Sequence, residues 1–356
     1  MKKRVEYIDL LRVLAILSVI AIHINAITRD AVISTNKIYY IFLTIMDSLT
    51  RAGVPLFFIL TGFFIFDKKE YYRTFIIRKL PKLIIPFVLI SFAYYIYNII
   101  DNHTTFNFLT FLQDFSNNKI CYHLWYMYHI IIIYLFIPYE KKMLDNIEKK
   151  DLLRLIVTVF TLGNFFVLLL RFSKRFDYPI FEAFALPDLI IYNNYVLLGS
   201  YLRKYDIKKK KTFIILGLFS LISMPILDYF YVKDVRNDLM LTATSLPPLF
   251  YSIAIYILVK DNYNKLKLSS KVKYLISKIS NLTLFIYLVH VMVMNILVKI
   301  ISAHWIYDRF YEKLLLSLIL FVLVFLISFI ISIILDLIYS KIEQKIISLE
   351  RKKLNA

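Results

Sequence analysis

Apolar residues dominate the chain in runs of about 20 residues, a length that crosses a bilayer as an α-helix. Short charged stretches separate these runs. The pattern predicts ten membrane-spanning helices, over residues 8–27, 40–66, 80–100, 121–138, 152–170, 186–202, 212–230, 241–259, 282–302 and 314–340. The second and tenth runs are longer than a perpendicular span requires, so we expect them to tilt, break or extend beyond the lipid.

The composition agrees with a membrane protein. Hydrophobic residues make up 60% of the 356 residues. We therefore predict an all-α, polytopic integral membrane bundle over residues 1–340, followed by a basic tail over residues 341–356. Only five glycines occur, which excludes Gly-rich phosphate loops. The single Cys121 excludes an intrachain disulfide framework and a cysteine-based zinc cluster, and we predict no metal site.

The net charge of +19 is distributed unevenly over the predicted loops. Alternate loops, together with both termini, hold about thirty Lys and Arg residues, whereas the remaining loops hold about ten. Because cytoplasmic loops carry the excess of positive charge, we predict a multi-pass protein of the plasma membrane with both termini in the cytoplasm. Nucleic-acid binding explains the charge less well, since the basic residues are scattered over short loops that also meet anionic lipid.

The first apolar run contains three ionisable residues, Asp9, Arg12 and His23. Arg12 and His23 are eleven residues apart, which on an α-helix is three turns plus about 20° and a rise of about 16.5 Å. The two side chains are therefore predicted to share one face. A structural reading remains open, with an Asp9–Arg12 ion pair and a histidine bonded to a carbonyl. Three ionisable groups in one span favour a function, although Asp9 also suits a helix N-terminus at the interface.

The second apolar run contains Arg51 and then the segment GVPLFFILTG over residues 53–62. Pro55 is expected to kink the helix or to free a carbonyl. Gly62 permits close backbone approach, either to a neighbouring helix or to a ligand. Arg51 is a candidate substrate-binding residue, but Asp47 lies four residues earlier, so an interfacial ion pair is the alternative.

Two further groups of residues are candidates for binding. The basic stretch after the second run includes Arg78 and Lys82, which suit phosphate binding or anchoring to anionic lipid. Aromatic and His side chains follow in later runs and suit carbohydrate rings, although Trp and Tyr are also common at membrane borders. These candidate substrate-binding residues are His123, Trp125, Tyr126, Tyr287 and His290.

In this order, these segments resemble the membrane-bound acyltransferase-3 family over nearly the whole chain. The resemblance rests on Arg12 and His23, with ten residues between them, and on residues 53–62. It continues through the basic stretch that ends at Pro86 and three later segments: YHLWYMYHIIIIYLFIP over 122–138, YNNYVLLGSYL over 192–202 and SNLTLFIYLVH over 280–290. Within the family, the chain looks most similar to stand-alone bacterial enzymes that O-acetylate surface polysaccharides.

The resemblance implies an O-acetyltransferase. Acetyl-CoA would enter from the cytoplasm, and the acceptor would be a hydroxyl of a cell-envelope polysaccharide or its lipid-linked precursor. His23 would be the essential histidine and a general base, with Asp9 as a second catalytic candidate. The predicted cofactor-binding residues are Arg12, Thr61, Gly62, Arg78 and Lys82. Thr61 and Gly62 stand where the family commonly has Ser-Gly, and Lys82 replaces a residue for which bidentate phosphate binding is expected.

Two other classes of function stay open on the sequence alone. A transporter or flippase also needs polar residues within a helical bundle, and the predicted polar residues lie on both sides of the membrane. A membrane scaffold with structural polar residues is the third reading. The ionisable groups in the first run favour the enzyme over the scaffold.

Overall fold

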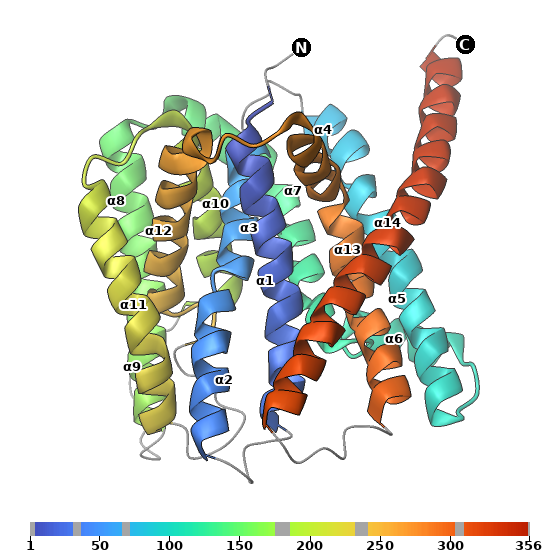
Figure 1. The fold of residues 1–356 in the computed structure, drawn as a ribbon. Coiled ribbons are helices and arrows are strands. Elements are labelled where there is room, and N and C mark those ends of the chain that lie inside the picture. Colours follow the sequence, from blue (N-terminus) through green and yellow to red (C-terminus); the bar gives the residue numbers. More distant parts are fainter. Residues whose placement is uncertain are drawn as a thin grey trace. The chain divides into compact units, whose positions relative to one another are not determined.

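A computed structural model of the protein describes residues 4–30, 37–65, 72–174, 186–231, 241–302 and 310–354. These residues are almost entirely helical, and no strand occurs among them (Figure 1). They divide into a first unit, residues 1–80 and 129–277, and a second unit, residues 81–128 and 278–356. The predicted all-α class is confirmed.

The first unit contains the helices α1 to α4 and α8 to α12, and most of α7. Their bounds are α1 Glu6–Asp30, α2 Lys37–Thr50, α3 Gly53–Ile65, α4 Tyr72–Lys79, α7 Trp125–Asn146, α8 Lys149–Phe160, α9 Phe166–Lys174, α10 Asp188–Lys204, α11 Lys210–Tyr231 and α12 Leu246–Asn262. A π-helical turn, η2 (Thr161–Phe165), joins α8 to α9, and a 3-10 turn, η4 (Tyr263–Leu266), follows α12. Within this unit α1 contacts α2, α3 and α12, and α3 contacts α10.

The second unit contains α5 (Pro81–Asn102), α6 (Phe108–Ser116), the 3-10 turn η1 (Tyr122–Leu124) and α14 (Phe310–Leu354). It also contains the first residues of α7 and most of α13 (Ser270–Ser302). The predicted tail over residues 341–356 does not begin as a separate element, because α14 continues through it to Leu354.

Six helical stretches among the described residues are long and apolar enough to cross a membrane: Glu6–Arg29, Tyr40–Phe64, Phe75–Asn102, Lys210–Asp228, Ser270–Ile301 and Leu314–Lys341. They fall on the first, second, third, seventh, ninth and tenth predicted spans. The other four predicted segments are helical as well, which fits a polytopic bundle, and the count of ten spans stays a prediction. Helix α10 is one of these four. It carries Asn, Ser and Tyr side chains and is buried along almost all of its length from Ile191 to Leu202.

The second predicted span is broken in the middle. Helix α2 ends at Thr50 and α3 begins at Gly53, so the break lies at Arg51 and Ala52. The sequence located the irregularity at Pro55, which instead occupies the first turn of α3. The Leu56 amide makes the first bond there, to the Ala52 carbonyl at 3.0 Å. A proline is harmless at such a position, since the amide that it lacks has no helical partner.

Helices α3 and α10 touch backbone to backbone through two glycines. A Cβ built on Gly62 would lie 1.8 Å from the Val196 carbonyl oxygen, and one built on Gly199 would lie 1.9 Å from the Ile59 carbonyl oxygen. No side chain fits at either position, because the obstacle is backbone rather than a flexible side chain. Small residues of this kind allow membrane helices to approach closely.

Replacing either glycine is expected to destabilise this helix pair. Gly62→Ala and Gly199→Ala each insert a methyl group into backbone atoms, and overpacking of this kind typically costs about 1–3 kcal/mol or more. Thermal unfolding in detergent is expected to show a clearly lowered midpoint for both variants. Ser200→Ala on α10 is the matched control, because its buried hydroxyl lacks a hydrogen-bond partner among the described residues and its loss should cost little. An unchanged midpoint for Gly62→Ala would contradict the close packing.

Candidate functional site

Arg12 and His23 lie on one uninterrupted helix. Helix α1 runs from Glu6 to Asp30 without a break, so the predicted rise of about 16.5 Å between the two residues applies. Both side chains are half-buried. The structure therefore confirms that they are carried on one helix, while their roles in binding and catalysis stay predictions.

The guanidinium of Arg12 stacks on an aromatic ring near the end of α3. Its central carbon lies 4.6 Å from the centre of the Phe64 ring. A second arginine, Arg203 at the end of α10, lies in the same way 4.7 Å from the Phe63 ring. The Phe63 and Phe64 rings contact each other edge to face with centres 5.4 Å apart. The end of α3 thus gathers two guanidinium groups, each held by a cation–π contact.

Sequence reasoning did not single out Arg203. It belongs to a basic stretch, residues 203–211, that the charge pattern explains as a cytoplasmic loop. What distinguishes Arg203 from the neighbouring lysines is the stacking on Phe63, which is a tertiary contact.

Asp9 is buried and forms an ion pair with Arg4. Two nitrogens of Arg4 donate to the two Asp9 carboxylate oxygens, at 2.5 and 3.0 Å, and Arg4 also donates to the Ser277 carbonyl. The hydrogen bond that Arg4 donates to Asp9 raises the pKa of Arg4 above its ordinary value. This bidentate pair fixes the segment before α1. It gives Asp9 a structural task beside the catalytic role, which stays a prediction.

Thr61 and Gly62 both make contacts within the helical bundle. The Thr61 hydroxyl donates to the Phe57 carbonyl one turn earlier, at 2.9 Å. Gly62 meets the Val196 backbone, as described above. Of the two sequence interpretations of Gly62, contact with a neighbouring helix is observed. The predicted contact of both residues with a cofactor is not tested by this packing.

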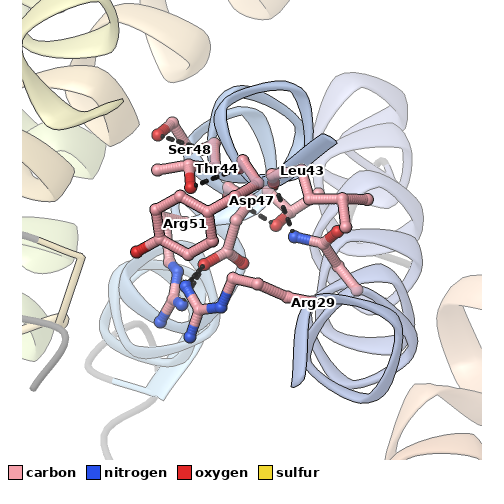
Figure 2. Close-up of polar contacts among 9 residues, drawn as sticks. Arg29, Leu43, Thr44, Asp47, Ser48 and Arg51 are labelled. Carbon is pink, nitrogen blue, oxygen red and sulfur yellow. Dashed lines mark hydrogen bonds and ion pairs between the residues drawn. The ribbon is translucent and has the colours of Figure 1, made fainter. Parts of the chain in front are cut away.

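Arg51 lies at the break between α2 and α3, where it shares a carboxylate with a second arginine. Figure 2 shows Asp47 on α2 with Arg51 and Arg29, which comes from the last turn of α1. Both arginines donate to the same carboxylate oxygen, Oδ2. The expected Asp47–Arg51 pair is confirmed. Arg29, which lies just beyond the first predicted run and was not singled out from the sequence, also pairs with Asp47.

Arg78 and Lys82, the predicted basic pair, are both exposed. Arg78 belongs to α4 in the first unit, whereas Lys82 belongs to α5 in the second. Each is accessible to a phosphate or to lipid headgroups. Phosphate binding and anchoring to anionic lipid therefore both stay predictions for these residues.

The second unit brings together most of the aromatic and His candidates. The His123 ring lies 5.1 Å from the His290 ring and 5.5 Å from the Tyr287 ring, measured between ring centres. The Tyr126 ring lies 5.2 Å from that of Tyr287. Trp125 contacts this cluster at its edge, with its ring centre 6.3 Å from that of Tyr126. Residues more than 160 positions apart in the chain thus form one cluster.

Hydrogen bonds fix the orientation of this cluster. The Tyr287 hydroxyl donates to the His123 carbonyl. Nδ1 of His290 lies 2.6 Å from the Tyr287 carbonyl. Because a carbonyl only accepts, Nδ1 carries the proton, and Nε2 of a neutral imidazole is then an acceptor. His123 and His290 are almost completely buried, so the cluster is packed rather than open.

Two residues of the cluster were not predicted. The Tyr94 ring lies 5.4 Å from that of His123, and its hydroxyl accepts from the Met292 amide within α13 at 2.8 Å. The Cys121 sulfur lies 3.2 Å from Nδ1 of His123. Neither had a sequence signal, because a buried tyrosine and a lone cysteine are ordinary in an apolar chain.

Comparison with protein families matches residues 5–337 to the family model Acyl_transf_3, described as an acyltransferase domain. The chain belongs to the acyltransferase-3 family. It is therefore a membrane acyltransferase, and its helices are those of a multi-pass membrane protein. Comparisons with curated proteins and with solved structures gave no match.

In this acyltransferase, the hydroxyl of Tyr287 is expected to stabilise the second-unit cluster. Tyr287→Phe keeps the ring contacts but leaves the buried His123 carbonyl without its donor, at a cost of about 1–3 kcal/mol. Thermal unfolding in detergent is expected to detect this loss. Tyr274→Phe is the control, since Tyr274 lies on the same helix, α13, and is 69% exposed. Equal effects of the two substitutions would contradict a role for the buried hydroxyl.

Proposed function

We propose that the protein transfers an acetyl group from cytoplasmic acetyl-CoA to a hydroxyl of a cell-envelope polysaccharide or its lipid-linked precursor. Family membership supports acyl transfer within the membrane. The uneven distribution of basic residues supports a location in the plasma membrane with both termini in the cytoplasm. On this orientation the N-terminal end of α1, which carries Arg12, faces the donor, and His23 lies toward the acceptor.

His23 is proposed as the general base. Its imidazole takes the proton of the acceptor hydroxyl while the oxygen attacks the thioester carbonyl. The carbon–sulfur bond then breaks, CoA leaves as the thiolate, and the imidazolium returns the proton to the sulfur. A neutral imidazole suits this task near pH 7. A covalent acetyl-His23 intermediate is the alternative route to the same products.

Arg12 is proposed to hold the CoA phosphates. The arrangement at the end of α3 supports this. Arg203 places a second guanidinium on the Phe63 ring, next to the Phe64 ring on which Arg12 lies. Guanidinium groups bind phosphates in a bidentate manner. The rise of about 16.5 Å from Arg12 to His23 is comparable with an extended pantetheine arm, so a donor held at Arg12 can present its thioester at His23. Arg78 and Lys82 are proposed as further contacts to phosphate.

The second-unit cluster is proposed to bind the sugar of the acceptor. Aromatic rings with polar tips suit sugar rings, and His123, Tyr126 and Tyr287 supply such rings within one cluster. Trp125 and His290 extend it through their ring contacts with Tyr126 and His123.

Transport is the second candidate function, and one observation favours it. The break between α2 and α3 lies within a membrane-spanning segment. Discontinuous helices are typical of transporters, where they form the substrate site. The repeat symmetry that accompanies them in many transporters was not found in the sequence, so acyl transfer remains the better-supported function.

Release of CoA thiol tests the enzymatic proposal. The purified protein in detergent is given acetyl-CoA and a panel of envelope glycans, and acceptor-dependent thiol release is expected. His23→Asn is expected to lower the rate by about 100-fold or more, because the base is lost. His103→Asn is the matched control, since His103 lies in an exposed turn with φ of 52°, a conformation that Asn tolerates. Solute uptake into sealed vesicles without thiol release for any acceptor would favour the transporter instead.

A further inference from the structure

A carboxyl group on α7 is bonded to an amide on α10, within the first unit. Nδ2 of Asn193 donates to Oε1 of Glu140. Glu140 lies two residues after the fourth predicted span, residues 121–138, which ends at the cytoplasmic side on the predicted topology. The pair joins α7 to the helix that packs backbone to backbone against α3. Sequence reasoning gave neither residue a role.

Each of the two groups has one oxygen without a partner. Oε2 of Glu140 and Oδ1 of Asn193 are both buried, and neither forms a hydrogen bond with any residue that the structure describes. Both atoms are acceptors when the carboxyl is ionised. Buried polar atoms are rarely left unpaired in proteins. What the pair lacks is therefore a donor, on two groups that are already in contact.

The charge of an ionised Glu140 would not be balanced at this position. Its carboxyl bonds a neutral amide rather than a cation. The lysines on the same two helices have other partners. On α7, Lys141 pairs with Asp145 at 3.9 Å, and from α10, Lys204 donates to the Leu144 carbonyl at 2.9 Å. A buried carboxyl without a cation favours its neutral, protonated form.

One further pair of titratable groups joins the same helices. The His129 ring of α7 contacts the Tyr192 ring of α10, with centres 5.0 Å apart. The pKa of Glu140 itself is set by two opposing causes. Burial raises it to about 7, and the hydrogen bond from Asn193 offsets only part of that rise.

We propose that Glu140 and Asn193 form a proton-binding site, in which Oε2 of Glu140 takes a proton from cytoplasmic water and donates it to Oδ1 of Asn193. The acid and the amide are then joined by two hydrogen bonds, one in each direction, and the charge of the site changes from −1 to zero. No other bond changes. Loss of the proton leaves a buried charge and one bond, so the α7–α10 contact weakens as cytoplasmic pH rises. This inference does not depend on the proposed acetyl transfer.

Infrared spectroscopy of the wild-type protein in detergent tests the site directly. A protonated carboxyl has a C=O stretch that is separate from the bands of carboxylates and amides. This stretch is expected at about pH 6, where exposed carboxyls are ionised, and is expected to be lost at about pH 8.5. Glu140→Gln should remove the band. If no such band occurs at about pH 6, or if Glu140→Gln retains all of it, Glu140 is ionised and bridged by water, and the proposal is wrong.

Asn193→Leu gives a second spectroscopic result that does not need Glu140→Gln to fold. The substitution keeps the carboxyl and removes both hydrogen bonds from it. Because hydrogen bonding lowers the frequency of a C=O stretch, the band is expected to move to higher frequency. A band at an unchanged frequency would show that the protonated group is not bonded to Asn193.

The pH dependence of thermal unfolding provides an independent measurement. The pKa of Glu140 is raised in the folded protein to about 7, from about 4.3 in the unfolded chain. The stabilisation by the neutral acid is therefore complete below about pH 4 and is lost as the pH rises through about 7. Glu140→Gln cannot ionise. Its midpoint relative to the wild type is expected to be at least about 2 °C higher at about pH 8.5 than at about pH 5.

Glu148→Gln is the matched control for this measurement. Glu148 is exposed and stands at the start of α8 without a side-chain capping bond. Its midpoint relative to the wild type is expected to stay the same over this pH range. A difference for Glu140→Gln that is also independent of pH would mean that Glu140 binds no proton in the range, which overturns the proposal.

Discussion

A membrane interior offers no water to a charged side chain, so each such group on α1 depends on a partner supplied by the protein. The structure shows these partners. Asp9 is paired with Arg4, Arg12 lies on the ring of Phe64, and Arg29 shares the carboxylate of Asp47. The partners come from the segment before α1, from α3 and from α2. The charged residues of α1 thus depend on the first unit being assembled around the helix, and the chemistry proposed for Arg12 and His23 depends on that assembly.

Helix α3 links the two ends of this arrangement. Its first residue, Gly53, approaches α1 so closely that a Cβ there would lie 2.9 Å from that of Ser18, between Arg12 and His23 along the helix. Its last turn supplies the rings for Arg12 and Arg203, and Gly62 fixes it against α10. The two glycines of α3 therefore have a packing role, and the last turn of the helix also carries the ring that contacts Arg12, the residue proposed to bind the donor.

Local features were predictable from the sequence, and distant contacts were not. The common helix of Arg12 and His23 follows from the length and polarity of one run, and the Asp47–Arg51 pair follows from a spacing of four residues. The α2–α3 break lies beside a contact that no local pattern predicts, from the Tyr251 hydroxyl to the Leu49 carbonyl 202 positions away. The cluster of His123 and Tyr287 joins residues 164 positions apart. Sequence reasoning selected both as binding candidates, but nothing in one sequence could pair them.

The central claim is that the charged and aromatic groups of this membrane acyltransferase serve O-acetylation of an envelope glycan. Mass spectrometry of envelope glycans from cells with and without the gene tests it most directly. The account predicts that one class of envelope glycan loses an acetyl unit in the deletion strain and regains it when the wild-type gene is restored, but not when His23→Asn is supplied. Identical glycan masses in both strains, under conditions in which the protein is made, would contradict it.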